Sequence, residues 1–371
     1  MADTENNKNS NSPALRFPGF SEPWKRIRLG DNCTIQMCKR IFANQTSEAG
    51  DVPFFKIGTI GSRPDAFISK ELFDEYKTKY NYPIEGEVMI TCAGTVGKTL
   101  QFDGSDSYFQ DSNIVWIHNP NQLTINDFLA YILGKINWNK LNSTTITRIY
   151  NDDLRNLFYY APENVAEQKN IVLLLRLIDE RISTQRRLID KLETLIKGIA
   201  ELLTTNTPNT KITDCLVCHS STLQENQAKS SGKYRVYGAS GICGYTDLPD
   251  VTVDSILIVK DGSGVGTVAY ASGKYSVIGT SNYLTAKNRN LLKYIYYCLK
   301  FFNFTPYKTG MAIPHIYFKD YGKAKIYCPA IEEQRKIAAA LSNIERKIEI
   351  ERTILQQYTI QKQYLLQQMF I

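Results

Sequence analysis

Two stretches of sequence decide the architecture: residues 161–203, APENVAEQKNIVLLLRLIDERISTQRRLIDKLETLIKGIAELL, and residues 328–370, CPAIEEQRKIAAALSNIERKIEIERTILQQYTIQKQYLLQQMF. Aligning Glu167-Gln168 with Glu333-Gln334 sets an offset of 166 residues (333 minus 167) between them. At this offset Ile171, Leu175, Ile178, Ile182 and Arg186 match Ile337, Leu341, Ile344, Ile348 and Arg352. Because each stretch has a proline shortly before its Glu-Gln pair, both are predicted to begin a helix there.

Apolar residues recur in both stretches at alternating intervals of four and three, which is typical of a coiled-coil seam. The predicted seam consists of Ile171, Leu175, Ile178, Ile182, Ile189, Leu192, Ile337, Leu341, Ile344, Ile348 and Leu355. A helix about 60 Å long cannot bury such a stripe by itself. We therefore expect the two helices to pair as an antiparallel coiled coil, with Gln185 and Glu351 setting the register. The alternative is a helix that lies on one large globular core.

Further apolar residues lie beside the predicted seam. They are Leu173, Leu174, Leu177, Leu188, Leu195, Ile350, Ile354 and Leu366. A two-helix coil leaves such positions partly exposed, and an exposed apolar stripe is typical of a surface that binds a partner. Packing against the chain's own domains is an equally open interpretation.

The repeat continues upstream of the helices into two mixed segments. Val96-Gly97 and Ser112-Asn113 match Val265-Gly266 and Ser281-Asn282 at an offset of 169 residues (265 minus 96). Short apolar runs that read as strands alternate with loops in both segments, and each segment also contains one predicted helix. The predicted fold class is α+β, with two duplicated domains separated by two long helices and related by a pseudo-two-fold axis.

The repeat also sets the expected domain boundaries. We expect a disordered tail at residues 1–14, a first domain at 15–160, a central helix at 161–205, a second domain at 206–327 and a distal helix at 328–371. Within the domains, strands are predicted at 53–60, 87–91 and 114–117, and again at 234–237, 254–259 and 266–270. Helices are predicted at 125–141 and 291–302.

The composition limits the class of protein. The chain has 371 residues, 43% of them hydrophobic, and 44 Lys and Arg against 37 Asp and Glu give a net charge of +7. This length predicts two to three packed domains, and the charge is compatible with a polyanionic partner. Eight cysteines are too few for a disulfide framework, and the polar residues 1–13 contain no secretory leader, so a reducing cytoplasm is expected. No apolar run approaches the length of a membrane span, so no membrane association is expected.

Three short motifs imitate cofactor or nucleotide sites, and each has a simpler interpretation. Residues 92–99 end like a phosphate-binding loop, but Cys92 stands where that loop needs glycine, so a tight turn between strands is favoured. Cys215-Leu-Val-Cys218-His219 has the spelling of a haem-attachment motif, but no export signal and no further zinc ligands accompany it. Asn119-Pro120 only begins like a motif of amino-methyltransferases, and it predicts a turn.

A fourth motif imitates a metal-dependent nuclease. Asp65, Glu75 and Lys77 have the loose spacing of carboxylates and a lysine that hold Mg²⁺ for phosphodiester cleavage. The spacing is common in exposed charged segments, and the second half of the chain has no equivalent. We therefore expect no catalytic residue, no metal ligand and no cofactor in this chain, and a stand-alone nuclease is the alternative hypothesis.

Basic residues in predicted loops and strand edges are the candidates for contact with DNA phosphates and bases. The candidates are Lys56, Arg63, Lys98, Lys140 and Arg148 in the first domain, and Lys233, Arg235, Lys260, Lys274, Lys308 and His315 in the second. Taken singly, each is more commonly a solvated surface charge. Two loops, 143–149 and 309–316, occupy equivalent places in the repeat, directly ahead of the long helices.

The sequence resembles the specificity subunit of type I restriction–modification systems. The resemblance is carried by Trp24-Lys-Arg-Ile-Arg-Leu-Gly-Asp31, the two Glu-Gln helix starts, Tyr237-Gly-Ala-Ser-Gly-Ile242 and Gly262-Ser-Gly-Val-Gly266, and it covers the chain from Leu15 onward. It implies two target-recognition domains, each of which reads one half of a split, asymmetric site in double-stranded DNA. It also implies that the paired helices separate the domains and dock two methyltransferase subunits.

The resemblance further implies that the chemistry belongs to other subunits. S-adenosylmethionine would be bound by the methyltransferase subunits, and ATP and Mg²⁺ would serve the partners, among them the motor–nuclease subunits. The chain itself would be a non-catalytic subunit. A coiled-coil adaptor without DNA recognition is a third hypothesis.

Overall fold

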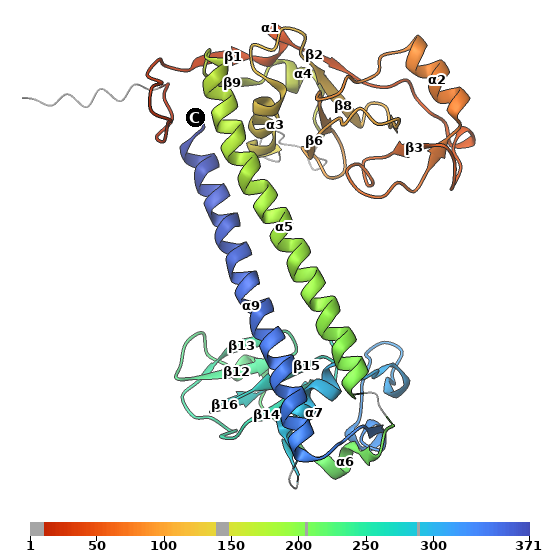
Figure 1. Cartoon of the computed structure of the whole chain (residues 1–371), viewed down its shortest axis with the longest axis vertical. Helices are drawn as coiled ribbons and strands as arrows, with labels where there is room; N and C mark the ends of the chain where they lie inside the picture. The colour runs from red at the N-terminus through yellow and green to blue at the C-terminus, as the bar shows by residue number, and fades with distance from the viewer. Residues whose placement is uncertain (1–10, 139–147, 205–206, 288–289) are drawn as a thin grey trace, which may run out of the picture. The chain divides into compact units, whose positions relative to one another are not determined.

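The chain divides into two units by its internal contacts. The computed structural model describes residues 11–138, 148–204, 207–287 and 290–371. Unit 1 comprises Met1–Ser183 with Gln356–Ile371, and unit 2 comprises Thr184–Leu355. Each unit therefore consists of a mixed domain and a stretch of both long helices, α5 (Val165–Thr204) and α9 (Ile331–Gln368) (Figure 1).

Unit 1 contains three small sheets. Their strand orders are β2-β8-β5-β6, β4-β3-β7 and β1-β9. The elements of its domain are β1 (Lys25–Arg28), α1 (Leu29–Asn32), β2 (Thr34–Gln36), η1 (Ala43–Gln45), β3 (Val52–Phe55), β4 (Phe67–Ile68), α2 (Lys70–Lys79), β5 (Val88–Thr91), β6 (Thr99–Gln101), β7 (Tyr108–Phe109), β8 (Ile114–His118), α3 (Asn126–Lys135), α4 (Asn151–Arg155) and β9 (Phe158–Ala161). The central strands β5 and β8 are almost fully buried, which explains their continuous apolar sequence.

The same three sheets recur in unit 2, with the orders β11-β17-β14-β15, β13-β12-β16 and β10-β18. The elements of its domain are β10 (Thr210–Lys211), α6 (Ile212–Cys215), β11 (Leu216–Ser220), η3 (Glu225–Gln227), β12 (Tyr234–Gly238), β13 (Gly241–Thr246), β14 (Ser255–Val259), β15 (Val268–Ala271), β16 (Tyr275–Val277), β17 (Ser281–Ala286), α7 (Leu292–Lys300), η4 (Thr305–Tyr307), α8 (Phe318–Tyr321) and β18 (Lys325–Ile326). In both units the strand pairing is antiparallel apart from one parallel pair, β3 with β7 and β12 with β16. The repeat in the sequence is thus a repeat of sheet topology.

The two domains differ most between the three-stranded sheet and the buried strand that follows it. In unit 1 this connection contains helix α2, which begins after Ser69, whose hydroxyl accepts a hydrogen bond from the Leu72 amide (3.3 Å), and which buries only Phe73. Unit 2 passes from β13 to β14 without a helix in its described residues. Helix α2 is not predicted from the sequence, because a single buried residue gives no helical periodicity.

Two predicted elements are much shorter than expected. The strand predicted at 53–60 is β3, Val52–Phe55, because the chain turns at Lys56, where the Thr59 and Ile60 amides both donate to the Lys56 carbonyl. The helix predicted at 125–141 is α3, which ends at Lys135.

In unit 1 the first half of α5 pairs with the last part of α9. Ile171, Leu175, Ile178 and Ile182 are all buried. The Lys362 Nζ atom lies 2.5 Å from the Asp179 carboxylate, and Arg181 donates to the Tyr358 hydroxyl at 3.3 Å. Residue numbers rise along α5 as they fall along α9, so the helices run antiparallel within this unit.

In unit 2 a polar pair joins the same two helices. The Gln185 side-chain amide donates to the Glu351 carboxylate and to the Glu351 backbone carbonyl (3.1 Å), and Arg352 reaches Glu193 at 2.5 Å. Hydrogen bonds from Lys347 and Gln185 hold the pKa of the buried Glu351 carboxyl below its usual value. These hydrogen bonds therefore favour the charged form of the Glu351 carboxyl.

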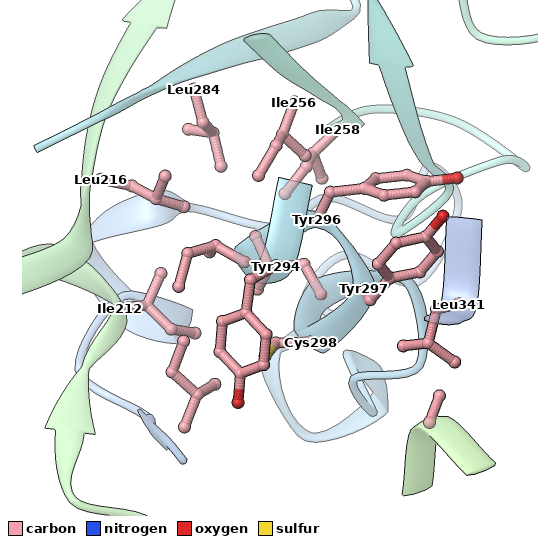
Figure 2. Close-up of a cluster of buried hydrophobic side chains, with 14 of the residues drawn as sticks. Ile212, Leu216, Ile256, Ile258, Leu284, Tyr294, Tyr296, Tyr297, Cys298 and Leu341 are labelled. Atoms are coloured by element: carbon pink, nitrogen blue, oxygen red, sulfur yellow. The ribbon is translucent and has the colours of Figure 1, made fainter. Parts of the chain in front are cut away.

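The seam residues of unit 2 do not pack only on each other. Ile189, Ile337, Leu341 and Ile348 are buried in one cluster with α7 and the four-stranded sheet, and Leu192, Ile344 and Leu355 are partly buried against it. Figure 2 shows Leu341 of α9 close to Tyr297 of α7. In this unit the stripe therefore contacts both the other long helix and the core of the mixed domain.

The apolar residues beside the seam are mostly on the surface. Leu173, Leu177, Leu188, Leu195 and Ile350 are exposed, and Leu174, Ile354 and Leu366 are partly buried. Packing against the chain's own domains therefore does not account for the exposed members of this set.

Candidate nucleic-acid interface

Three loops of unit 2 meet at one end of its sheets. The turn between β14 and β15 closes where the Gly266 amide donates to the Val259 carbonyl (2.9 Å). The loop 309–316 is bonded to this turn, because the Ile316 amide donates to Lys260 (2.9 Å) and the Gly262 amide to Pro314 (3.0 Å). The β12–β13 turn adjoins the β14–β15 turn, since a Cβ on Gly264 would lie 3.8 Å from the Ala239 carbonyl oxygen. We call these segments, residues 238–241, 260–266 and 309–316, the unit 2 loop cluster.

Basic side chains surround one acidic residue, Asp261, in and next to this loop cluster. His315 Nδ1 lies 3.0 Å from Asp261 Oδ1, and Lys260 Nζ lies 3.9 Å from Asp261 Oδ2. Lys308 is exposed at the start of the loop, and no carboxylate among the described residues forms an ion pair with it. The cluster thus offers cations that are at most partly neutralised by Asp261, as a polyanion-binding surface requires.

Unit 1 has an equivalent loop cluster, formed by residues 56–61, 92–98 and 148–149. The Gly97 amide donates to Thr91 (2.8 Å) and the Ile149 amide to Cys92 (2.9 Å), which repeats the two bonds of Gly266 and Ile316. The correspondence of these backbone bonds shows that the two domains build their loops on the same frame.

Three of the predicted basic residues come together in the unit 1 loop cluster. Lys98 Nζ donates to the Ile60 carbonyl (2.5 Å), Lys56 pairs with Asp65 (3.1 Å), and Arg148 donates to the Ser112 carbonyl (3.5 Å). Lys98 and Arg148 therefore also hold neighbouring loops together. Arg63 lies in an exposed loop shortly after Ile60, and Lys140 lies outside the described residues.

The predicted basic residues of unit 2 form two groups rather than one. Lys260 and His315 belong to the loop cluster, and Lys308 directly precedes it. The cluster includes Gly238 at the end of β12, next to Tyr237, whose carbonyl accepts a hydrogen bond from the Ile278 amide just after β16 (2.9 Å). Arg235 instead lies opposite Tyr275 at the beginning of these two parallel strands, so Lys233, Arg235 and Lys274 gather at their other end. Sequence position alone did not separate the two groups.

The turn at 92–99 connects two strands, as favoured from the sequence. Gly97 has φ +82°, and a Cβ there would lie 2.0 Å from Trp138 Cδ1. Gly266 has φ +90° at the corresponding place, and a Cβ would lie 3.2 Å from Phe304 Cβ. The glycines thus allow an aromatic ring to approach the turn, which is a packing requirement and not a sign of phosphate binding.

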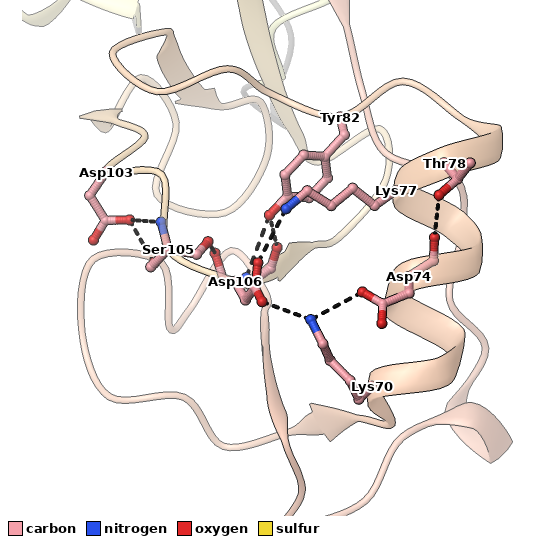
Figure 3. A network of polar contacts seen from close by, with 9 residues as sticks. Lys70, Asp74, Lys77, Thr78, Tyr82, Asp103, Ser105 and Asp106 are labelled. Atoms are coloured by element: carbon pink, nitrogen blue, oxygen red, sulfur yellow. Dashed lines mark hydrogen bonds and ion pairs between the residues drawn. The ribbon is translucent and has the colours of Figure 1, made fainter.

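The nuclease-like residues are not assembled into a site. Asp65 pairs with Lys56, Glu75 pairs with Lys79 (2.9 Å), and Lys77 reaches Asp106 at 3.2 Å. Figure 3 shows Lys70 and Lys77 converging on Asp106, and these hydrogen bonds lower the pKa of the Asp106 carboxyl. Throughout the part of the chain that the structure describes, no three His, Cys, Asp or Glu side chains are placed to hold a metal ion.

The haem-like motif is used structurally. Cys215 is buried at the end of α6 and lies in the core cluster of unit 2. Burial raises the pKa of Cys218 to about 11, so this thiol stays protonated at neutral pH. His219 lies 2.9 Å from the Thr285 hydroxyl and stacks on Tyr283 at 4.7 Å between ring centroids.

Sequence reasoning missed several residues of the loop clusters. Asp261, which faces both Lys260 and His315, was not a candidate, and neither were the exposed apolar residues Met311 and Ile313 at the tip of the loop 309–316. The available signals were the glycines, which mark turns, and the repeat, which marks the loop 309–316. Neither shows which turns meet.

Comparison with known proteins assigns the chain to a family. The model for the type I restriction modification DNA specificity domain matches residues 21–194 and again 206–359. The two matches together cover most of the chain, which therefore belongs to this family.

Individual proteins are similar to this chain in sequence or in fold. A Haemophilus influenzae protein described as a type I restriction enzyme specificity subunit is 46% identical over 177 residues, which are 48% of this chain and 42% of that protein. The S subunit of a type I restriction-modification system from M. genitalium has the same fold, with a TM-score of 0.69, 18% identity and coverage of 97% of this chain and 99% of that chain. A chain from a structure on complex assembly and conformational transition of the type I R-M system has a TM-score of 0.53 at 16% identity, covering 95% of this chain and 98% of that chain.

Among the described residues, no helix is both long enough and apolar enough to cross a bilayer.

Proposed function

We propose that this chain is the DNA-specificity subunit of a type I restriction–modification complex and reads a split, asymmetric site in double-stranded DNA. The observation that carries the proposal is the duplicated loop cluster. Both domains have the same sheet orders and the same backbone bonds around the cluster, but they place different side chains on it. Two domains that share a backbone frame but carry different surface side chains are suited to recognising two different half-sites.

The basic residues of the clusters supply the affinity in this proposal. Lys56 and Arg148 in unit 1, and Lys260, Lys308 and His315 in unit 2, would contact DNA phosphates. Lys98 would stiffen its cluster through the Ile60 carbonyl and contribute charge. Lys233, Arg235 and Lys274 would reach a phosphate only if the DNA extends along β12, and we assign them a secondary role. Arg63 and Lys140 remain further phosphate-contact candidates.

The long helices supply spacing and docking in this proposal. Both units contain part of α5 and part of α9, so an antiparallel coiled coil with pseudo-two-fold symmetry would hold the two readers at a set separation. The exposed residues Leu173 and Leu177 in unit 1, and Leu188 and Leu195 in unit 2, offer apolar area for two methyltransferase subunits.

The catalytic chemistry would be carried out by the partner subunits. In this proposal the chain is non-catalytic, S-adenosylmethionine is bound by the methyltransferase subunits, and ATP and Mg²⁺ serve the motor–nuclease subunits. The complex would work in the cytoplasm, the compartment in which it meets DNA.

A domain exchange tests the proposal. Residues 206–327 are replaced with the corresponding domain of another specificity subunit, and the chimera is expressed with its methyltransferase and motor–nuclease partners. Because each domain is proposed to read one half-site, we expect one half of the methylated sequence to change while the other half stays the same. Methylation-sensitive sequencing of the host genome provides the measurement.

The reciprocal chimera, with residues 15–160 replaced, is the matched control and should change the other half only. An unchanged methylated sequence in both chimeras would contradict DNA reading by these domains. That outcome would favour a coiled-coil adaptor.

A further inference from the structure

The tip of the loop 309–316 is held rigidly although its side chains are exposed. The Thr309 amide donates to the His315 carbonyl (2.9 Å) and the His315 amide donates to the Thr309 carbonyl (2.7 Å), which closes the loop on itself. Gly310 has φ +90°, and a Cβ at this position would lie 2.3 Å from the Ile313 carbonyl oxygen. The conformation of the tip is therefore fixed by its backbone and requires glycine at residue 310.

Two large apolar side chains stand on this fixed tip. Met311 is fully exposed and Ile313 is 58% exposed. Neither belongs to a hydrophobic core cluster of the described residues. An exposed apolar pair on a backbone that is already ordered loses little further entropy when it is covered, so it is suited to binding.

The charge around the tip selects a polyanion as the binding partner. Lys308 precedes the tip, His315 follows it, and Lys260 is bonded to the same loop through its carbonyl. Asp261 is the acidic residue among them, and it already faces His315 and Lys260. An apolar tip with the basic side chains of Lys308 and Lys260 nearby matches a DNA groove, where phosphates flank the apolar C5-methyl groups of thymines.

We propose that Met311 is a specificity-determining residue that contacts the C5-methyl group of a thymine in the major groove, with Ile313 packed beside it. This inference rests on the proposed DNA-reading function and adds the base and the chemical group that are read. The unbranched thioether of Met311 adapts to the position of a methyl group. The neighbouring cations hold the phosphates on either side of the tip.

Uracil substitution tests this contact directly, because deoxyuridine differs from thymidine only by the missing methyl group. The full chain, in complex with its methyltransferase partners, is titrated with duplexes that carry its methylated sequence. Each thymine in the half-site read by unit 2 is replaced with deoxyuridine, one at a time. At one position we expect the affinity of the unchanged protein to fall about fourfold, the effect of one buried methyl group.

Variants assign the effect to Met311. Met311→Ala should bind the thymine and uracil duplexes equally well at that position. Leu248→Ala, at another exposed apolar residue of the same unit (80% exposed), should keep the fourfold preference. Lys308→Ala should weaken binding to both duplexes alike and reduce the salt dependence by about one unit.

The outcomes separate this inference from the function on which it rests. If the unchanged protein binds its own sequence no better than a scrambled duplex, both are wrong. If it prefers its own sequence but the unit 2 half-site contains no thymine, or tolerates every uracil, only the Met311 contact is wrong. The contact is also wrong if Met311→Ala keeps the preference for thymine.

Discussion

Single residues at the turns carry much of the correspondence between the two domains. Gly97 and Gly266 both have positive φ, and both lie against an aromatic side chain, Trp138 or Phe304. The surrounding sequences differ, but the backbone geometry favours glycine at both positions. Each turn brings two strands close enough to pair, β5 with β6 in unit 1 and β14 with β15 in unit 2. The aromatic ring packs against the turn.

Gly97→Ala should therefore destabilise unit 1 markedly. A Cβ would lie 2.0 Å from Trp138 Cδ1, so the ring must move, and the positive φ is strained for alanine. We expect a loss of about 3 kcal/mol in the free energy of unfolding, from backbone strain and overpacking together. Urea unfolding followed by tryptophan fluorescence measures this loss, since Trp24, Trp116 and Trp138 all lie in unit 1.

Gly19→Ala is the matched control. Gly19 has φ +91°, but no atom lies within 4 Å of an added Cβ, so this substitution should cost only the backbone strain, about 1 kcal/mol. Equal losses for the two variants would show that contact with Trp138 does not constrain the turn.

At the scale of the elements, hydrogen bonds to one charged side chain hold helices α7 and α9 together. The Glu345 carboxylate of α9 accepts hydrogen bonds from Tyr296 (2.8 Å), Tyr297 (2.8 Å) and Lys300 (2.5 Å) of α7. Burial disfavours the charged form of Glu345, but the hydrogen bonds from Lys300 and the two tyrosines outweigh it and lower the pKa to about 2. Folding thus stabilises the ionised carboxylate.

Glu345→Gln should weaken this joint by about 2 kcal/mol at neutral pH, the usual contribution of hydrogen bonds to a charged group. The folded-state pKa is lower than the usual value of 4.5, so the stabilisation is fully present above pH 4.5 and declines as the pH falls towards 2. We therefore expect the difference between the unchanged protein and the variant to shrink over this range. Hydrogen exchange of the α7 amides at several pH values measures the effect.

Glu349→Gln is the control on the same helix, because Glu349 is exposed. It should leave the exchange of α7 unchanged at every pH. A constant difference between the unchanged protein and Glu345→Gln from pH 6 to pH 3 would contradict the role assigned to the ionised carboxylate.

The sequence predicts elements with long periodicity well and loop contacts poorly. The interval of four and three residues in α5 and α9 extends over many turns, so the residue pattern by itself indicates both helices. Helix α2 has one buried residue, Phe73, and left no comparable pattern. The hydrogen bond between Ile316 and Lys260 joins backbone atoms far apart in the chain, and backbone bonds of this kind leave no signature in residue type. The sequence therefore predicts which basic residues belong to the candidate site. It does not predict that the basic residues of unit 2 form two separate groups.

For the whole molecule, the spacing proposal makes a quantitative prediction. Seven residues, two helical turns, are inserted into α5 after Ser183 and seven into α9 after Leu355, where both helices pass from one unit to the other. The added rise of about 10 Å corresponds to about three base pairs of DNA. We expect the gap in the methylated sequence to lengthen by about three base pairs while both half-sites stay the same, as genome methylation sequencing would show.

An insertion into α5 alone is the control. It shifts one helix against the other, so the Gln185–Glu351 pair of unit 2 and the Asp179–Lys362 pair of unit 1 cannot both keep their register, and it should abolish methylation. If the double insertion leaves the gap at its original length, the helices do not determine the spacing.

The packing of residues from opposite ends of the sequence has a consequence for synthesis. The Leu15 amide donates to the Gln368 carbonyl (2.9 Å), and the buried Phe370 ring contacts Trp24 at 6.2 Å and Phe128 at 5.0 Å between centroids. Leu15, Trp24 and Phe128 are therefore synthesised long before the residues with which they pack. On the ribosome, the contiguous unit 2 is complete first, and unit 1 can close its interior only when Phe370 emerges.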